Sequence, residues 1–253
     1  MTYINFNLLF IGGLVTLLLF LFLLFTKVDL KGKIFAFFCL TLSLYNFGMY
    51  FILFATSASI ALFLYKISII GGIIAVMFLL HFTILFTNCK KGYMKHVYIF
   101  SLVLIVLAMG NGFFSGVKLN DGNYRETLNF GYYIFTYFVM ASYAFILTKF
   151  IIHLKKSKKF EEKNRTKYLI VFLSILSITV VLDMLRNADI FVLFDTLLTQ
   201  YGIIIFVSGV TYTIVKFKLL NINVIIEKSV LYSTIGIIVL LILCQIAFDI
   251  YIN

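Results

Sequence analysis

Long apolar runs occupy most of this 253-residue chain, and they constrain its fold more than any other feature. A transmembrane helix needs about 20 mainly apolar residues, because the hydrocarbon core of a bilayer is about 30 Å thick. Hydrophobic residues make up 63% of the chain and charged residues only 12%, which excludes a water-soluble domain. We therefore expect an all-α integral membrane protein, a bundle of about eight transmembrane helices (seven plus one). The eight runs lie near residues 5–26, 34–55, 58–87, 96–115, 129–152, 168–187, 196–215 and 229–250.

The basic residues between these runs predict how the bundle is oriented. The first, third, fifth and seventh connectors hold sixteen of the 21 Lys and Arg residues. Short cytoplasmic loops carry an excess of Lys and Arg, so we expect these connectors in the cytoplasm and the N-terminus outside. These cytoplasmic basic residues also account for the net charge of +11. They lie where they can interact with the anionic lipids of the membrane surface. The lipid bilayer is thus an expected partner, whereas nucleic acid is not, because no basic domain stands clear of the membrane.

Ionisable side chains inside apolar runs are costly, and each is a functional hypothesis by default. Lys66 lies about 12 Å inside the third run at 1.5 Å per residue, and Asp183 lies near the outer end of the sixth. Pairing of Lys66 with Asp183 or Asp195 would form a polar pocket that opens outward. The alternative is that Lys66 extends to the headgroups and that the aspartates are solvated rim residues. The candidate ligand-binding residues are Lys66, Asp183, Arg186, Asp195, Gln200 and Tyr201.

Other polar or small residues in the runs indicate helix packing. His81 and Asn46 are each expected to form a hydrogen bond to a neighbouring helix. Gly71 and Gly72 are expected to allow two helices to approach closely. No second His or Cys lies at ligand spacing from His81, so we expect neither a metal site nor a cofactor.

The chain lacks the motifs that would indicate an enzyme. It has no paired-carboxylate motif, nucleophile elbow, phosphate-binding loop or HExxH sequence. A small permease, channel or transporter subunit is the main alternative to a signalling protein. Transporter helices are often interrupted by Gly or Pro in corresponding positions of two halves, and this chain contains no proline.

Three stretches carry a resemblance to a known family: SLYNFGMYFILFATS in the second run, YKISIIGGIIAVMFLLHFTILFTN in the third, and YTIVKFKLLNINVIIEKSVLYSTI after the seventh. Over about residues 35–240 the chain resembles the N-terminal seven-transmembrane sensor region of bacterial histidine kinases. That family often has Trp where Tyr45 stands and Pro where Thr87 stands. The resemblance implies a signal-input module of the bacterial plasma membrane that senses a small extracellular or membrane ligand. Its implied partner is a histidine kinase output domain or a separate protein. The resemblance leaves open whether the module forms a homodimer.

The resemblance also divides the chain into a seven-span sensor domain (1–215), a cytoplasmic connector (216–228) and an additional C-terminal transmembrane helix (229–253). The connector contains neither Gly nor Pro, and a stiff connector would transmit a helix shift to the output machinery. The alternative is a short turn at the membrane surface. No ATP-binding domain or phosphoacceptor helix is recognisable, so the module is expected to be non-catalytic by itself, as a fragment or as a stand-alone protein. The expected coupling residues are Lys216, Lys218, Asn221, Asn223 and Lys228.

Overall fold

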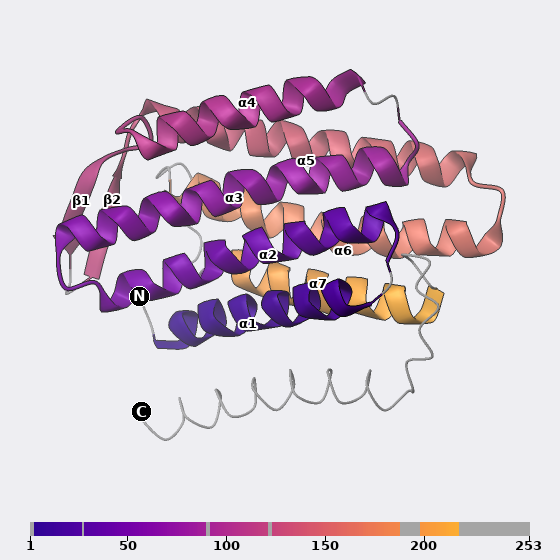
Figure 1. Ribbon diagram of the computed structural model, residues 1–253, viewed down its shortest axis with the longest axis horizontal. Coiled ribbons are helices and arrows are strands. Elements are labelled where there is room, and N and C mark those ends of the chain that lie inside the picture. The colour runs from indigo at the N-terminus through magenta and orange to yellow at the C-terminus, as the bar shows by residue number, and fades with distance from the viewer. Residues whose placement is uncertain (1–2, 27, 90–91, 121–122, 188–197, 218–253) are drawn as a thin grey trace.

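The computed structural model describes residues 3–26, 28–89, 92–120, 123–187 and 198–217. Seven α-helices form most of this part of the chain and run alternately up and down along one axis (Figure 1). They are α1 (Tyr3–Phe25), α2 (Leu30–Phe51), α3 (Ala58–Phe86), α4 (Gly92–Met109), α5 (Phe130–Lys156), α6 (Phe160–Asn187) and α7 (Leu198–Phe217). A short 3₁₀ helix, η1 (Ile52–Phe54), extends α2.

The helices agree with the first seven predicted runs. Helices α1 to α6 are each long and apolar enough to cross a membrane, and α7 has a shorter apolar part, Leu198–Ile214. The predicted eighth helix, residues 229–250, lies outside the residues that the structure describes. The predicted end of the fourth run was wrong, because α4 stops at Met109 instead of near residue 115. The chain then leaves the helix as a strand.

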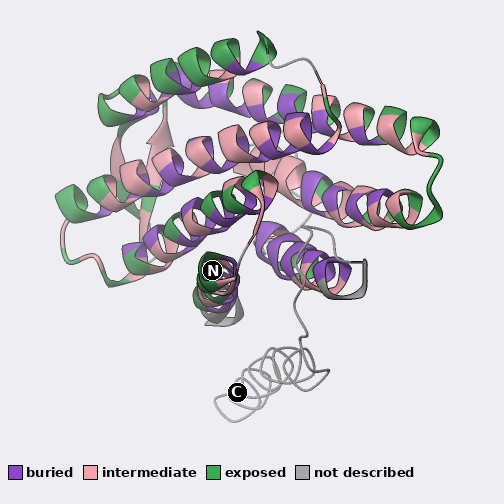
Figure 2. Cartoon of the chain, turned by 45° about the vertical axis from the view of Figure 1, so that its right-hand side comes forward, coloured by how far each residue is buried: buried purple, intermediate pink, exposed green. Residues whose placement is uncertain are grey.

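Six of the helices form a closed ring, and the fourth lies outside it. The neighbours around the ring are α1, α2, α3, α5, α6 and α7, and α7 returns to pack on α1. Helix α4 packs against α3 and α5 from outside, and much of its surface is exposed (Figure 2). This order places α2, α3, α5, α6 and α7 around a common interior, although they are far apart in sequence.

Phenylalanine side chains fill the ring where α2, α3 and α7 meet. The Phe35 ring lies 5.2 Å from that of Phe82 and 6.2 Å from that of Phe206, centroid to centroid, and Phe38 lies 5.9 Å from Phe206. Phe35, Phe82 and Phe206 are fully buried. Tilted and edge-on aromatic pairs of this kind stabilise a packed core beyond their buried area.

A β-hairpin covers one end of the bundle, which we call the hairpin end. Strand β1 (Phe114–Asn120) pairs antiparallel with β2 (Asn123–Leu128), and both strands contact α3 (Figure 1). The Tyr65 hydroxyl of α3 donates to the Tyr124 carbonyl at 2.9 Å. The sequence analysis did not predict this hairpin. Helix α3 has 29 residues, and its N-terminal part contacts the hairpin.

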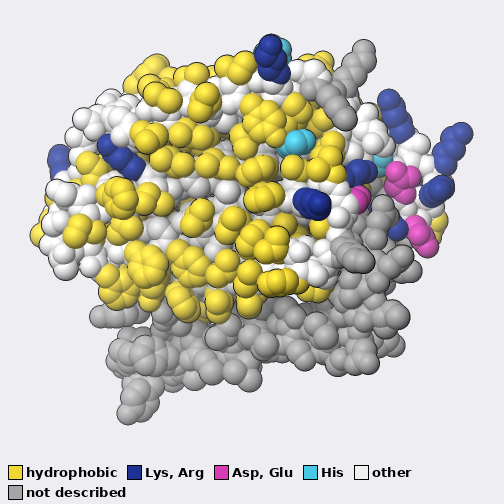
Figure 3. All heavy atoms as spheres, viewed as in Figure 1, with side chains coloured by type: hydrophobic (Ala, Val, Ile, Leu, Met, Phe, Trp, Pro, Cys, Tyr) yellow, Lys and Arg dark blue, Asp and Glu magenta, His cyan; other side chains and the backbone are white. Residues whose placement is uncertain are grey.

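The opposite end, which we call the basic end, carries most of the described Lys and Arg residues. Helix α5 ends at Lys156 and α6 begins at Phe160, so both helices continue into the charged part of the sequence and only a short turn separates them. Across this turn His153 Nε2 lies 3.2 Å from Glu162 Oε1, and Arg165 pairs with Glu161 at 3.7 Å. Figure 3 shows this charged end beside a broad apolar surface on the flank of the bundle. The apolar flank is the surface that a membrane-embedded bundle presents to lipid.

Candidate ligand cavity

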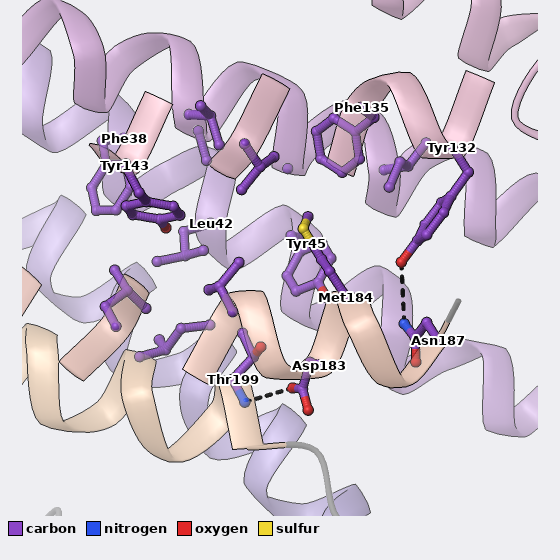
Figure 4. Close-up of a pocket in the computed structure, with 18 residues that line it drawn as sticks. Phe38, Leu42, Tyr45, Tyr132, Phe135, Tyr143, Asp183, Met184, Asn187 and Thr199 are labelled. Atoms are coloured by element: carbon purple, nitrogen blue, oxygen red, sulfur yellow. Dashed lines mark hydrogen bonds between the residues drawn. The ribbon is translucent and has the colours of Figure 1, made fainter. Parts of the chain in front are cut away.

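A cavity of about 90 Å³ lies inside the ring, between α2, α3, α5, α6 and α7. Its walls are mainly aliphatic and aromatic, and its polar groups are Tyr45, Tyr132, Tyr143, Asp183, Asn187 and Thr199. Figure 4 shows Tyr143 with Phe38 and Leu42 at one end of the lining, and Tyr132 with Asn187 at the other. Ligand sites are typically apolar hollows with a few polar groups that fix orientation. This cavity has that character, but it is small.

Asp183 is the only carboxylate among the described lining residues, and it connects α6 to the start of α7. Its Oδ1 accepts a hydrogen bond from the Leu198 N–H at 3.0 Å, and its Oδ2 accepts one from the Thr199 N–H at 2.6 Å. The first N–H groups of a helix have no partner within the helix and carry a partial positive charge. Asp183, only 6% exposed, therefore caps α7 from the neighbouring helix.

The charge of Asp183 is balanced within the protein. Arg186, one turn along α6, places Nη1 3.7 Å from Asp183 Oδ1. Its Nη2 also donates to Asn187 Oδ1 at 3.2 Å, and Asn187 Nδ2 donates to the Tyr132 hydroxyl at 3.3 Å. The polar end of the cavity is thus a connected network that holds α5, α6 and α7 together.

Two glycines of α7 allow this helix to pack closely against α6, on the side of the cap that leads to the basic end. A Cβ atom on Gly202 would overlap the Thr179 side chain, and one on Gly209 would overlap the Phe172 ring. Both glycines are buried. They lie seven residues apart, as do Thr179 and Phe172, so the same face of each helix repeats after two turns. Helices α6 and α7 therefore form one packed unit from the cap toward the basic end.

The structure does not support the expected pairing of Lys66 with Asp183, because the two side chains have different partners at different sites. Its Nζ donates to the Met109 carbonyl at 3.0 Å and lies 3.4 Å from Asn111 Oδ1. Met109 is the last residue of α4, where carbonyl groups lack partners and a cation is favourable. Lys66 therefore caps α4 at the hairpin end. The other expected partner, Asp195, lies outside the described residues.

Gln200 and Asn46 lie side by side at the junction of α1, α2 and α7, which we call the α1–α7 seam. Gln200 is 1% exposed and Asn46 0%. A Cβ atom on Gly12 would lie 3.1 Å from Gln200 Oε1 and 3.6 Å from Asn46 Nδ2, so Gly12 provides the space for both amides. Neither Gln200 Oε1 nor either polar atom of Asn46 has a hydrogen-bond partner among the described residues. Asn46 therefore does not form its expected interhelical hydrogen bond with any described residue.

The remaining predictions have mixed outcomes. Tyr201 is 41% exposed and does not line the cavity. His81 was correctly expected to bond a neighbouring helix, because its Nδ1 lies 2.6 Å from the Tyr98 hydroxyl of α4. Lys216 lies in the last turn of α7, but its side chain lies outside the described part of the chain, as do residues Lys218, Asn221, Asn223 and Lys228. No group of three or more His, Cys, Asp or Glu within the described ranges could hold a metal ion.

The two glycines of α3 differ in role. A Cβ atom on Gly71 would lie 3.0 Å from the Thr41 carbonyl oxygen and 3.1 Å from the Tyr45 nitrogen, both backbone atoms of α2. Gly71 therefore permits close packing of α2 and α3, as predicted. A Cβ atom on Gly72 would lie 3.5 Å from the Tyr45 ring, an ordinary contact distance, and Gly72 lines the cavity.

Together, the ring of long apolar helices and its internal cavity define a multi-pass membrane protein with an intramembrane pocket. The chain belongs to the family described as the N-terminal 7TM region of histidine kinase, whose model matches residues 8–223. This match confirms the resemblance inferred from the three sequence stretches. No curated protein and no solved structure matches the chain significantly. The family makes the chain a sensor input region, and the cavity is its candidate site.

Proposed function

We propose that the chain is the membrane-embedded input module of a histidine-kinase-type signalling system and is non-catalytic by itself. A small molecule in the cavity, or a change in membrane packing around it, is the proposed input. The observation that carries this proposal is the position of Asp183, which borders the cavity and caps α7 at the same time. Helix α7 leads directly into the proposed connector, residues 216–228.

The proposed mechanism is a shift of the α6–α7 unit. A ligand that touches Asp183, Asn187 or Thr199 changes the network that fixes the start of α7. Because Gly202 and Gly209 pack α7 closely against α6, the two helices would move together. Packed helices have discrete arrangements, so a small local change can become a helix shift. The connector would pass this shift to a kinase output domain or partner kinase.

The proposed orientation places the hairpin end outside and the basic end in the cytoplasm of a bacterial plasma membrane. It rests on the ten Lys and Arg residues described at the basic end, counted over Lys31, Lys33, Lys95, Lys155, Lys156, Lys158, Lys159, Lys163, Arg165 and Lys167. An excess of these residues marks the cytoplasmic side. Single cysteines at Lys158 and at Lys118, in a variant without native cysteines, test the orientation. An impermeant thiol reagent should reach only Lys118→Cys in intact cells, and the reverse pattern would overturn it.

The function is tested by uncoupling the input from the output. The full chain is expressed together with its partner kinase, and phosphoryl transfer is measured. Asp183→Asn should change the basal output, because it weakens the junction between the cavity and α7. Two glycines inserted after Asn223 should abolish the effect of Asp183→Asn, since a flexible connector cannot transmit a helix shift. Unchanged output in both variants would contradict the proposal.

A further inference from the structure

Two tyrosine hydroxyls in the cavity have no hydrogen-bond partner among the described residues. Tyr143 of α5 and Tyr45 of α2 both line the cavity, and neither forms a hydrogen bond within the described part of the chain. Tyr143 is only 7% exposed, and its hydroxyl appears in Figure 4 near Leu42, away from the network around Asp183. A tyrosine hydroxyl can both donate and accept, and buried polar groups are normally paired. Each hydroxyl is therefore available to pair with a molecule bound in the cavity.

The described lining residues offer no unpaired charge to a bound molecule. Both Asp183 oxygens accept N–H groups of α7, and Arg186 lies beside the carboxylate. A cationic ligand would have to displace these partners, whereas an anionic ligand would face Asp183 without a free cation. Burying an unpaired charge among apolar walls is also costly. These facts favour a neutral ligand.

The volume sets an upper limit on size. A dry cavity of about 150 Å³ holds a benzene molecule, and this cavity is about 90 Å³. The ligand in this conformation must therefore be smaller than benzene. Its apolar part would contact residues such as Val76, Val139 and Leu176 in the walls.

We propose that the cavity binds a small neutral amphiphile, a short-chain alcohol or carbonyl compound, whose polar group pairs with the hydroxyl of Tyr143. This inference names the ligand class of the proposed sensor site and rests on the proposed function. The apolar part of the molecule fills the space between α3, α5 and α6. A neutral amphiphile also partitions into the bilayer, so it is available to a site at membrane depth.

The binding test uses fluorinated probes of suitable size. The full chain in lipid nanodiscs is titrated with 2,2,2-trifluoroethanol, 1,1,1-trifluoroethane or trifluoroacetate, and binding is followed by fluorine NMR. Nanodiscs without protein give the partition background. Trifluoroethanol should bind about five- to tenfold more tightly than trifluoroethane, which lacks the hydroxyl group, as expected for one net hydrogen bond. Trifluoroacetate should not bind.

Three variants locate the site. Tyr143→Phe should remove the advantage of trifluoroethanol over trifluoroethane and leave trifluoroethane binding unchanged. Gly72→Ala should weaken both neutral probes, because its methyl group occupies the cavity at ordinary contact distance. Tyr133→Phe is the matched control, since Tyr133 is 40% exposed and does not line the cavity. It should bind all probes as the unchanged protein does.

Several results would overturn the inference. They are equal binding of the alcohol and the alkane, binding of trifluoroacetate, insensitivity to Gly72→Ala, or no binding of any probe, in which case the cavity holds only water. None of these would contradict the proposed function if Asp183→Asn still changes the kinase output. Conversely, an alcohol that binds without any coupling between Asp183 and the output would contradict the function alone.

Discussion

Replacement of Asp183 by Asn should loosen the start of α7 and destabilise the bundle. The substitution keeps the shape of the side chain but exchanges one accepting oxygen for an NH₂ group. One of the two bonds from the Leu198 and Thr199 N–H groups is then lost, and the NH₂ group faces a donor. Arg186 also loses its charged neighbour at 3.7 Å.

The number of hydrogen bonds lost and their burial set the size of the expected loss of stability. A hydrogen bond to a charged group contributes about 1.5–3 kcal/mol net, and an N-terminal cap alone about 1 kcal/mol. Since one charge-assisted bond is lost at a buried site, we expect the free energy of unfolding to fall by about 2 kcal/mol. The removed charge–dipole attraction at the N-terminus of α7 acts in the same direction.

Unfolding of the purified protein by SDS in mixed micelles, followed by circular dichroism, measures this change. Asp29→Asn is the matched control, because Asp29 caps α2 through the Gly32 N–H at 2.9 Å but is half-exposed. Asn and Asp are about equally good at such a position, so the control should lose less than about 0.5 kcal/mol. Hydrogen exchange adds a local readout, since the first N–H groups of α7 should lose protection. Equal stability of the two variants, with unchanged exchange at residues 198 and 199, would refute the reasoning.

Three further substitutions test the packing and the polar groups. Gly71→Ala should lower the free energy of unfolding by about 1–3 kcal/mol in the same assay, because its methyl group meets backbone atoms of α2. Asn46→Leu should raise it by about 1 kcal/mol or leave it unchanged, because it removes an unpaired buried amide; a clear loss would show that Asn46 has a partner. Lys66→Met should cost about 1 kcal/mol through the Met109 carbonyl. Its effect should add to that of Asp183→Asn within about 0.5 kcal/mol, and a large recovery in the double variant would restore their pairing.

The helices could be predicted from the sequence because the bilayer sets their length. Runs of about 20 apolar residues left little choice except membrane-spanning helices, and the first seven runs agree with α1 to α7. The hairpin was missed because Phe113 and Phe114 prolong the fourth apolar run and hide its end. One signal was available: Asp121–Gly122 lies between two short segments and is typical of a two-residue hairpin turn.

The site could be predicted only in part. Asp183 stood out because a carboxylate in an apolar run is rare, and it does border the cavity. Its partner could not be predicted, because the order of helices around the ring is not contained in the apolar pattern. Lys66 faces the end of α4, whereas Asp183 faces the start of α7. Tyr143 was missed because the chain has 16 tyrosines, and none is conspicuous among so many aromatic residues.

The α1–α7 seam has a consequence for the order of assembly during synthesis. The ring closes where the first helix meets the seventh, so α1 and α2 must wait in the bilayer until residues 198–217 have been made. During that interval Asn46 has only lipid or the incomplete bundle beside it, and an exposed amide in hydrocarbon is costly. A chain whose synthesis stops before α7 therefore leaves the amide of Asn46 uncovered by that helix. Membrane proteases or chaperones that recognise exposed polar groups could use the uncovered α1–α7 seam to distinguish the unfinished bundle from the closed one.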